Sequence, residues 1–225
     1  MEDLLLQTLP SKEQIQQLPI FQNLPLQQIQ VIHSLQQCHA IEQELKTCTL
    51  FGFDSESKPT FNKGEVSTGP HLIQLASRDK AYLFQISPAI LEFLKPIFEN
   101  KNQMKVGFGL KNDAHLFRKK GIELHNVIEL SKCFSAFGLS NPMGLKNAMA
   151  LLFQVNFPKS KKISTSNWAR KILTPHQIEY AAADAYAPVL VFEELLRLGL
   201  LPKTMTRHLF KLSMQPNTIK AETDA

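Results

Sequence analysis

A short apolar run that ends in two carboxylates is the feature of this chain that most constrains its fold. The segment from Phe51 to Glu56 reads Phe-Gly-Phe-Asp-Ser-Glu and predicts the end of a buried strand. Residues i and i+2 of a strand share one face, so Asp54 and Glu56 point to the same side. Carboxylates about 7 Å apart along a strand repel each other unless a cation lies between them. The simpler alternative is a solvated strand end before the turn at Pro59.

The composition is that of one compact globular domain, with 225 residues, 44% hydrophobic and 20% charged. No apolar stretch reaches the length of a membrane span, so we expect no membrane partner. The three cysteines, Cys38, Cys48 and Cys133, have no C-x-x-C spacing, and no secretory signal is evident, which predicts reduced thiols and a cytoplasmic location. The net charge of +5 suits a polyanionic partner such as nucleic acid, and equally a soluble protein without one.

Residues 1–44 predict a helical N-terminal extension packed on the main domain, because they lack glycine and are rich in Leu, Ile and Gln. Ser11 is expected to cap a first helix, and Pro25 to begin a second. The apolar face of that second helix would carry Leu26, Ile29, Ile32 and Leu35.

Strand and helix patterns alternate through the rest of the chain, which predicts an α/β domain. The runs His71 to Ala76 and Ala81 to Gln85, with a short polar connection, predict a hairpin. A helix is expected from Ser87-Pro88 to Phe98, a short strand and a glycine turn after Met104, a strand over Asn126 to Leu130, and a helix over Gly144 to Phe153.

Two more acids lie on predicted helices. Asp113 follows a strand and a glycine turn, so it is either a helix cap or an acid at the carboxyl end of a strand, where open sheets bind ligands. Thr174 and Gln177 form a capping box, which fixes the start of a helix running to Leu198. Tyr180 and Asp184 then share one face of that helix, and the surrounding alanines permit close packing on the sheet.

A basic loop precedes this last helix. It contains Lys159, Lys161, Lys162 and the single tryptophan, Trp168. Lys161 and Lys162 are weaker candidates for contacts with substrate phosphates. For Trp168 we favour a role as an anchor to the core.

In its motifs the chain resembles the DEDD superfamily of 3'-5' exonucleases. Asp54 and Glu56 match the D-x-E motif, Asp113 matches the second motif, and Tyr180 with Asp184 matches Y-x-x-x-D. The histidine branch of the superfamily has a histidine where Glu179 stands here, so the tyrosine (DEDDy) branch is the better match. The flanking sequences are most similar to Werner-type exonuclease domains, with some similarity to ribonuclease D. Three motifs in order are far more specific than any one of them.

The resemblance implies a ribonuclease H-like fold, with a mixed five-stranded sheet flanked by helices and the Asp54 strand at its centre. The exonuclease domain would span residues 45–212, followed by a disordered tail over residues 213–225. Glu129 departs from the aspartate expected in relatives, and we expect this to affect packing rather than chemistry.

The resemblance also implies the chemistry. Two divalent cations, Mg²⁺ or Mn²⁺, would be held by Asp54, Glu56, Asp113 and Asp184, while Tyr180 orients the attacking water. The enzyme would release nucleoside 5'-monophosphates from the 3' end of DNA or RNA, acting on single-stranded or 3'-recessed nucleic acid. Two alternatives are a non-catalytic nucleic-acid-binding module on the same fold and an α/β protein that binds another ligand.

Overall fold

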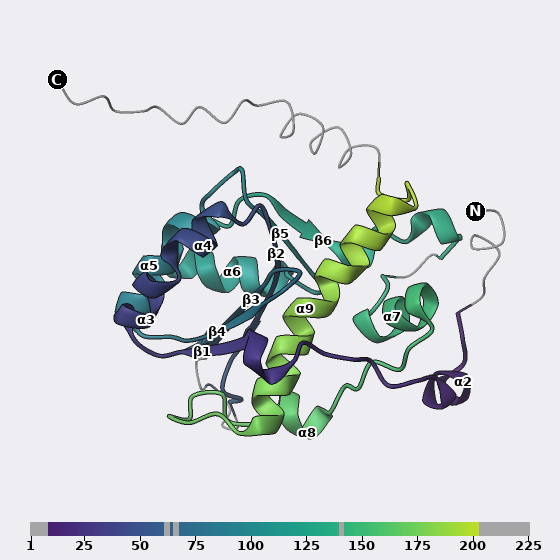
Figure 1. The fold of residues 1–225 in the computed structure, drawn as a ribbon, viewed down its shortest axis with the longest axis horizontal. Helices are drawn as coiled ribbons and strands as arrows, with labels where there is room; N and C mark the ends of the chain where they lie inside the picture. Colours follow the sequence, from purple (N-terminus) through teal and green to yellow (C-terminus); the bar gives the residue numbers. More distant parts are fainter. Residues whose placement is uncertain (1–8, 61–63, 65–67, 140–141, 203–225) are drawn as a thin grey trace.

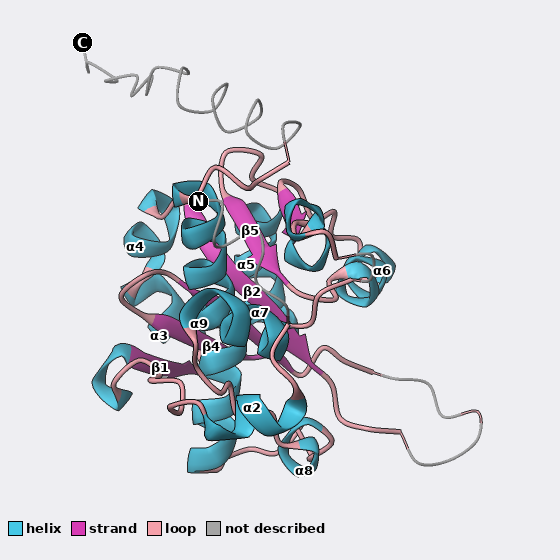
Figure 2. Ribbon diagram, turned by 90° about the vertical axis from the view of Figure 1, so that its right-hand side faces the viewer, coloured by secondary structure: helices cyan, strands magenta, loops and turns pink. Residues whose placement is uncertain are grey.

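A six-stranded mixed sheet with helices on both faces forms the protein (Figures 1 and 2). The computed structural model describes residues 9–60, 64, 68–139 and 142–202. The strands lie in the order β1-β4-β3-β2-β5-β6. Only β3 is antiparallel to its neighbours, β2 and β4. Their bounds are β1 (Ile29–Ile32), β2 (Leu50–Glu56), β3 (Leu72–Ala76), β4 (Ala81–Gln85), β5 (Met104–Gly107) and β6 (Val127–Glu129).

Helices cover the sheet in two layers. The described α-helices are α2 (Lys12–Gln17), α3 (Leu35–Ala40), α4 (Glu42–Thr47), α5 (Pro88–Phe98), α6 (Lys111–Lys119), α7 (Leu145–Phe153), α8 (Lys161–Ser164) and α9 (Pro175–Arg197). Helices α3 to α6 pack on the face that carries Phe51 and Phe53. The long helix α9 crosses the other face, as Figure 1 shows. In the part of the chain that the structure describes, no helix combines the length and hydropathy needed to cross a bilayer.

The α/β prediction is confirmed, but the predicted number of five strands is wrong. The additional strand, β1, forms in the segment that we expected to be the second N-terminal helix, and it pairs in parallel with β4. Ile29 packs into the core under α9, whereas Ile32 packs into the core on the opposite face. Their spacing therefore reflects a strand buried on both sides, because pairing with the sheet overrides a helix-like pattern.

Several local predictions are confirmed. Ser11 and Gln14 form a capping box at α2, and Thr174 and Gln177 form one at α9. The β3–β4 hairpin forms as expected. Strand β2 ends at Glu56, as expected from the run Phe51 to Glu56, and carries both acids of the first motif. The predicted tail, residues 213–225, lies outside the described residues.

Candidate active site

Three carboxylates meet where β2 passes under α9. One oxygen each from Asp54, Glu56 and Asp184 lies within 4.8 Å of the other two. Asp54 and Glu56 alternate with Ser55 along β2, so their side chains share one face of the strand. Asp184 comes from α9, which lies on that same face.

Gly52 allows α9 to come this close. A Cβ atom at this position would lie 1.8 Å from the carbonyl oxygen of Ala185, the residue after Asp184. The alanines around Asp184 were predicted to permit close packing, but sequence reasoning missed the role of Gly52. The signal was present, since a glycine inside a strand often marks a close backbone approach.

Asp113 lies beside this cluster, in the first turn of α6. Its carboxylate accepts a hydrogen bond from the hydroxyl of Ser55. Its charge also contributes to raising the pKa of Asp54 and Glu56, so it belongs to the same electrostatic site. The structure thus brings three predicted acids together directly and holds the fourth next to them through Ser55, which sequence reasoning did not single out.

Glu129 fixes the turn that leads into α6. Its carboxylate accepts hydrogen bonds from the backbone N–H groups of Gly109 (3.0 Å) and Leu110 (2.8 Å). These N–H groups belong to the turn just before the helix that carries Asp113. Glu129 therefore supports the position of an acid in the site, which is more than the packing effect expected from the sequence.

The acids raise one another's pKa. Burial and the charges of Asp184, Asp113 and Glu56 hold the pKa of Asp54 well above its ordinary value. Burial and the charge of Asp184 raise the pKa of Glu56 to about 8. Burial raises the pKa of Asp184 to about 6. Carboxylates this close do not all stay ionised near neutral pH unless cations offset their charge.

An unpartnered oxygen also fits a cation. Asp184 is 5% exposed, and its Oδ1 atom has no hydrogen-bond partner among the described residues. A buried acceptor without a donor is costly, whereas carboxylate oxygens are the ligands that Mg²⁺ and Mn²⁺ prefer. The residues present therefore fit a divalent-cation site.

Tyr180 lies one helical turn before Asp184 and is 8% exposed. Burial and the charges of Asp184 and Glu56 raise the pKa of its hydroxyl above its ordinary value. The hydroxyl thus keeps its proton at neutral pH and is available as a hydrogen-bond donor.

In the basic loop, Lys159 is the lysine whose charge acts on the acids. Its charge lowers the pKa of both Glu56 and Asp184, against the effect of burial. Lys161 and Lys162, the residues favoured from the sequence, are exposed at the start of α8, and their contact with substrate stays a prediction. Trp168 is 1% exposed, and its indole N–H donates to the Ser164 carbonyl, as its predicted anchoring role requires.

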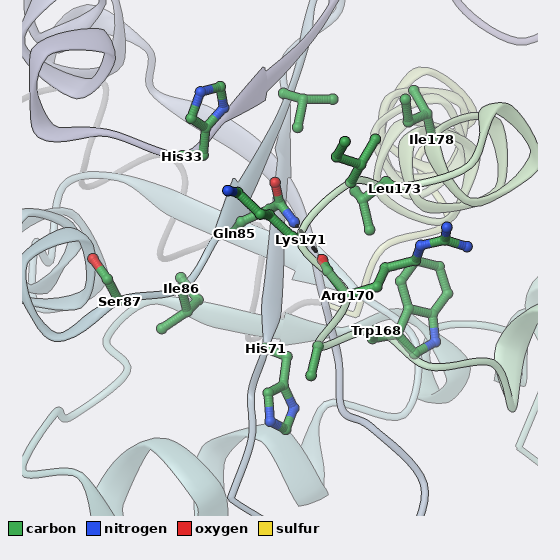
Figure 3. A pocket seen from close by; sticks show the side chains of 13 residues that line it. His33, His71, Gln85, Ile86, Ser87, Trp168, Arg170, Lys171, Leu173 and Ile178 are labelled. Carbon is green, nitrogen blue, oxygen red and sulfur yellow. Dashed lines mark hydrogen bonds between the residues drawn. The ribbon is translucent and has the colours of Figure 1, made fainter.

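A pocket of about 600 Å³ lies at the end of the sheet where Glu56 and Gln85 are both paired with Leu72. His71 lies on its wall, and its backbone N–H donates to the carbonyl oxygen of Glu56. Figure 3 shows Arg170 and Lys171 on the loop between Trp168 and Leu173, which forms another wall. The pocket thus joins cationic and apolar side chains, and none of the four acids lines it.

Comparison with known proteins decides the family. A family model described as 3'-5' exonuclease matches residues 29–199. The chain belongs to the 3'-5' exonuclease family. The match begins at β1, so the strand that sequence reasoning read as a helix is part of the family's domain.

Two relatives are named as exonucleases. The chain is 32% identical over 169 residues to the bifunctional 3'-5' exonuclease/ATP-dependent helicase WRN of Mus musculus, covering 71% of this chain and 12% of that protein. It is 27% identical over 195 residues to the exonuclease mut-7 homolog of Aedes aegypti, covering 74% of this chain and 26% of that protein. The chain thus spans only a minor part of either relative.

Solved structures share the fold. The Nibbler EXO domain of Aedes aegypti superposes with a TM-score of 0.69 at 22% identity, covering 84% of this chain and 99% of that one. RNase D of Escherichia coli superposes with a TM-score of 0.62 at 21% identity, covering 82% of this chain and 50% of that one. The ribonuclease H-like fold predicted from the sequence is confirmed by these likenesses.

Proposed function

We propose that this protein is a metal-dependent 3'-5' exonuclease of the tyrosine branch, which releases nucleoside 5'-monophosphates from the 3' end of a nucleic acid strand. The observation that carries the proposal is the meeting of Asp54, Glu56 and Asp184 within 4.8 Å, with Asp113 held alongside by Ser55. The family and the named relatives indicate the same activity.

The four acids would hold two divalent cations, Mg²⁺ or Mn²⁺. Bound there, such cations supply Lewis-acid chemistry, neutralising charge on the phosphate and lowering the pKa of a water molecule. The protein's part is to hold the carboxylates together against their repulsion. Helix α9 contributes to this, because its close contact at Gly52 fixes Asp184 above β2.

Tyr180 would orient the attacking water through its protonated hydroxyl, and Lys159 would meet the negative phosphate. The raised pKa of Tyr180 supports a donor role, since a phenol that keeps its proton orients water without removing a proton from it. Lys159 already acts electrostatically on Glu56 and Asp184, so a phosphate held by the acids through cations would lie within its reach.

We propose single-stranded or 3'-recessed nucleic acid as the substrate. A structural neighbour, RNase D of Trypanosoma brucei, has been solved in complex with RNA U12, with a TM-score of 0.67 at 15% identity and covering 95% of this chain and 77% of that one. Arg170 and Lys171 on the wall of the pocket would suit a polyanionic strand.

Degradation of a 5'-labelled oligonucleotide, as DNA and as RNA, tests the proposal. With Mg²⁺ or Mn²⁺ we expect a ladder of products shortened from the 3' end, and with chelator none. Asp54→Ala and Asp184→Asn should abolish the ladder and keep the fold. Glu179→Gln is the matched control on the same helix, because Glu179 is exposed and its carboxylate pairs with His176, at 3.8 Å, rather than with the acids.

A binding module without catalysis is the rival function. It would bind the labelled strands without shortening them, with either metal. Full activity of purified Asp54→Ala would instead show that the carboxylate cluster is not the catalytic centre.

A further inference from the structure

Gln74 is a buried polar residue without a partner. It lies in the middle of β3 and is 0% exposed. Neither its Nε2 nor its Oε1 atom has a hydrogen-bond partner among the described residues. An unsatisfied buried polar atom destabilises the folded state, so a residue retained in this state needs an explanation.

Apolar side chains surround Gln74 on most sides. Leu72 and Ala76, two residues away on β3, share its face and belong to the core under α9. Leu83, its direct partner on β4, belongs to the same core. None of these three side chains offers a donor or an acceptor to the carboxamide.

On β2, the other strand next to β3, the residue opposite Gln74 is Asp54. The two residues are directly opposite each other in the antiparallel pair of β2 and β3. Direct partners in such a pair point to the same face, with Cβ atoms about 4.5–5.5 Å apart. The carboxamide of Gln74 thus has a carboxylate of the proposed cation site as its cross-strand neighbour.

Other buried glutamines of this chain are hydrogen-bonded. Gln103, 3% exposed, donates from Nε2 to the carbonyl oxygens of Leu45 (2.7 Å) and Cys48 (2.8 Å). Gln177, 3% exposed, donates to the hydroxyl of Ser166 at 2.9 Å. Gln74 differs from both, and it is the one that faces the carboxylate cluster.

We propose that Gln74 is a positioning residue of the cation site, whose Nε2–H group donates to the Asp54 carboxylate when cations are bound. This inference rests on the proposed function. Asp54 already accepts one hydrogen bond, from the backbone N–H of Ser55 at 2.9 Å. A second donor from the neighbouring strand would fix the plane of the carboxylate, as outer partners of metal ligands commonly do.

The proposal predicts opposite effects on stability and on metal binding. Gln74→Met keeps the length of the side chain and removes both unsatisfied atoms. The metal-free variant should therefore unfold at the same or a higher temperature than the wild type. Its affinity for Mn²⁺ should fall by about 10- to 100-fold, because the partner of a ligand is lost.

Gln103→Met is the matched control. It removes a buried carboxamide that is satisfied and remote from the acids, so it should lower the unfolding temperature and leave Mn²⁺ affinity unchanged. Mn²⁺ titration by calorimetry and thermal unfolding with chelator measure the two properties without any assay of nuclease activity. Gln74→Leu serves as a second variant if the methionine packs poorly.

The outcomes separate the inference from the proposed function. If the wild type binds Mn²⁺ and a folded Gln74→Met or Gln74→Leu protein binds it equally well, the positioning role is wrong and the exonuclease proposal stands. If the wild type binds no Mn²⁺, or Asp54→Ala binds it as the wild type does, both proposals fail.

Discussion

Gly52 of β2 and Ala185 of α9 are in backbone contact, so close that a Cβ atom on Gly52 would lie 1.8 Å from the Ala185 carbonyl oxygen. This contact sets the height of α9 above the sheet. Because Asp184 precedes Ala185, the same contact brings its carboxylate to Asp54. The packing of α9 and the position of Asp184 thus both depend on the absence of a side chain at Gly52.

Gly52→Ala should therefore damage both stability and metal binding. The obstacle is a backbone atom that cannot rotate away, so we expect a loss of about 3 kcal/mol or more in the free energy of unfolding. Mn²⁺ affinity should fall as well, because Asp184 is displaced. Chemical denaturation and Mn²⁺ titration measure the two effects.

Gly144→Ala is the control for this substitution. Nothing lies within 4 Å of a Cβ atom built at Gly144, and its φ of −84° suits any residue. A Gly52→Ala protein as stable as Gly144→Ala would contradict the close contact.

Ser55→Ala tests how Asp113 is held. Loss of the Ser55 hydroxyl frees the Asp113 carboxylate, and we expect nuclease activity to fall by about 10- to 100-fold, as for outer partners of metal ligands generally. Ser11→Ala removes the cap of α2 instead, so it should cost about 1 kcal/mol of stability and leave activity intact. Equal activities of the two variants would argue against a role for Ser55.

The pH dependence of Mn²⁺ affinity follows from the raised pKa values. In the metal-free protein, Glu56 has a pKa of about 8 and Asp184 of about 6, so protons compete with cations below these values. Affinity should rise steeply from pH 6 to 8. Calorimetry in buffers of different ionisation enthalpy should detect proton release in this range. A flat affinity profile across it would show that these carboxyls are already ionised.

Lys105 predicts a separate pH effect, on stability. It is 0% exposed on β5, and its ammonium donates to the carbonyl oxygens of Ile97 (3.1 Å) and Asn100 (3.0 Å). Burial lowers its pKa to about 8 from the ordinary 10.5. Between these values the unfolded chain binds more protons than the folded one, so stability should increase as pH rises from about 8 to 10.5. Lys105→Met should lack this increase in urea denaturation curves.

Local signals explain which parts of the fold could be predicted from the sequence. The capping box at Thr174 fixed the phase of α9, and alternation along β2 put Asp54 and Glu56 on one face. Strand β1 escaped prediction because a four-residue edge strand is decided by its pairing with β4, which lies some fifty residues later in the chain. The three-residue spacing of Ile29 and Ile32 fits one face of a helix, and it fits equally well a strand that is buried on both faces.

The candidate site, like the fold, was predicted only in part from the sequence. Its acids were predicted because their motifs are short and ordered. Gly52, Ser55 and Gln74 were not, since each acts through a residue on another element that only the folded chain brings near. Lys159 was seen as part of a basic loop, but its advantage over Lys161 and Lys162 depends on where the loop lies relative to Glu56.

Lys159→Gln should therefore weaken substrate binding more than substitution of its neighbours. Loss of this charge near the acids removes an attraction for the phosphate, so we expect a higher KM and a shallower dependence of KM on salt. The double variant Lys161→Gln, Lys162→Gln removes two exposed charges from the same loop and should change KM less. Steady-state kinetics on one oligonucleotide, at several salt concentrations, compare them. A larger effect of the double variant would move the phosphate contact from Lys159 to α8.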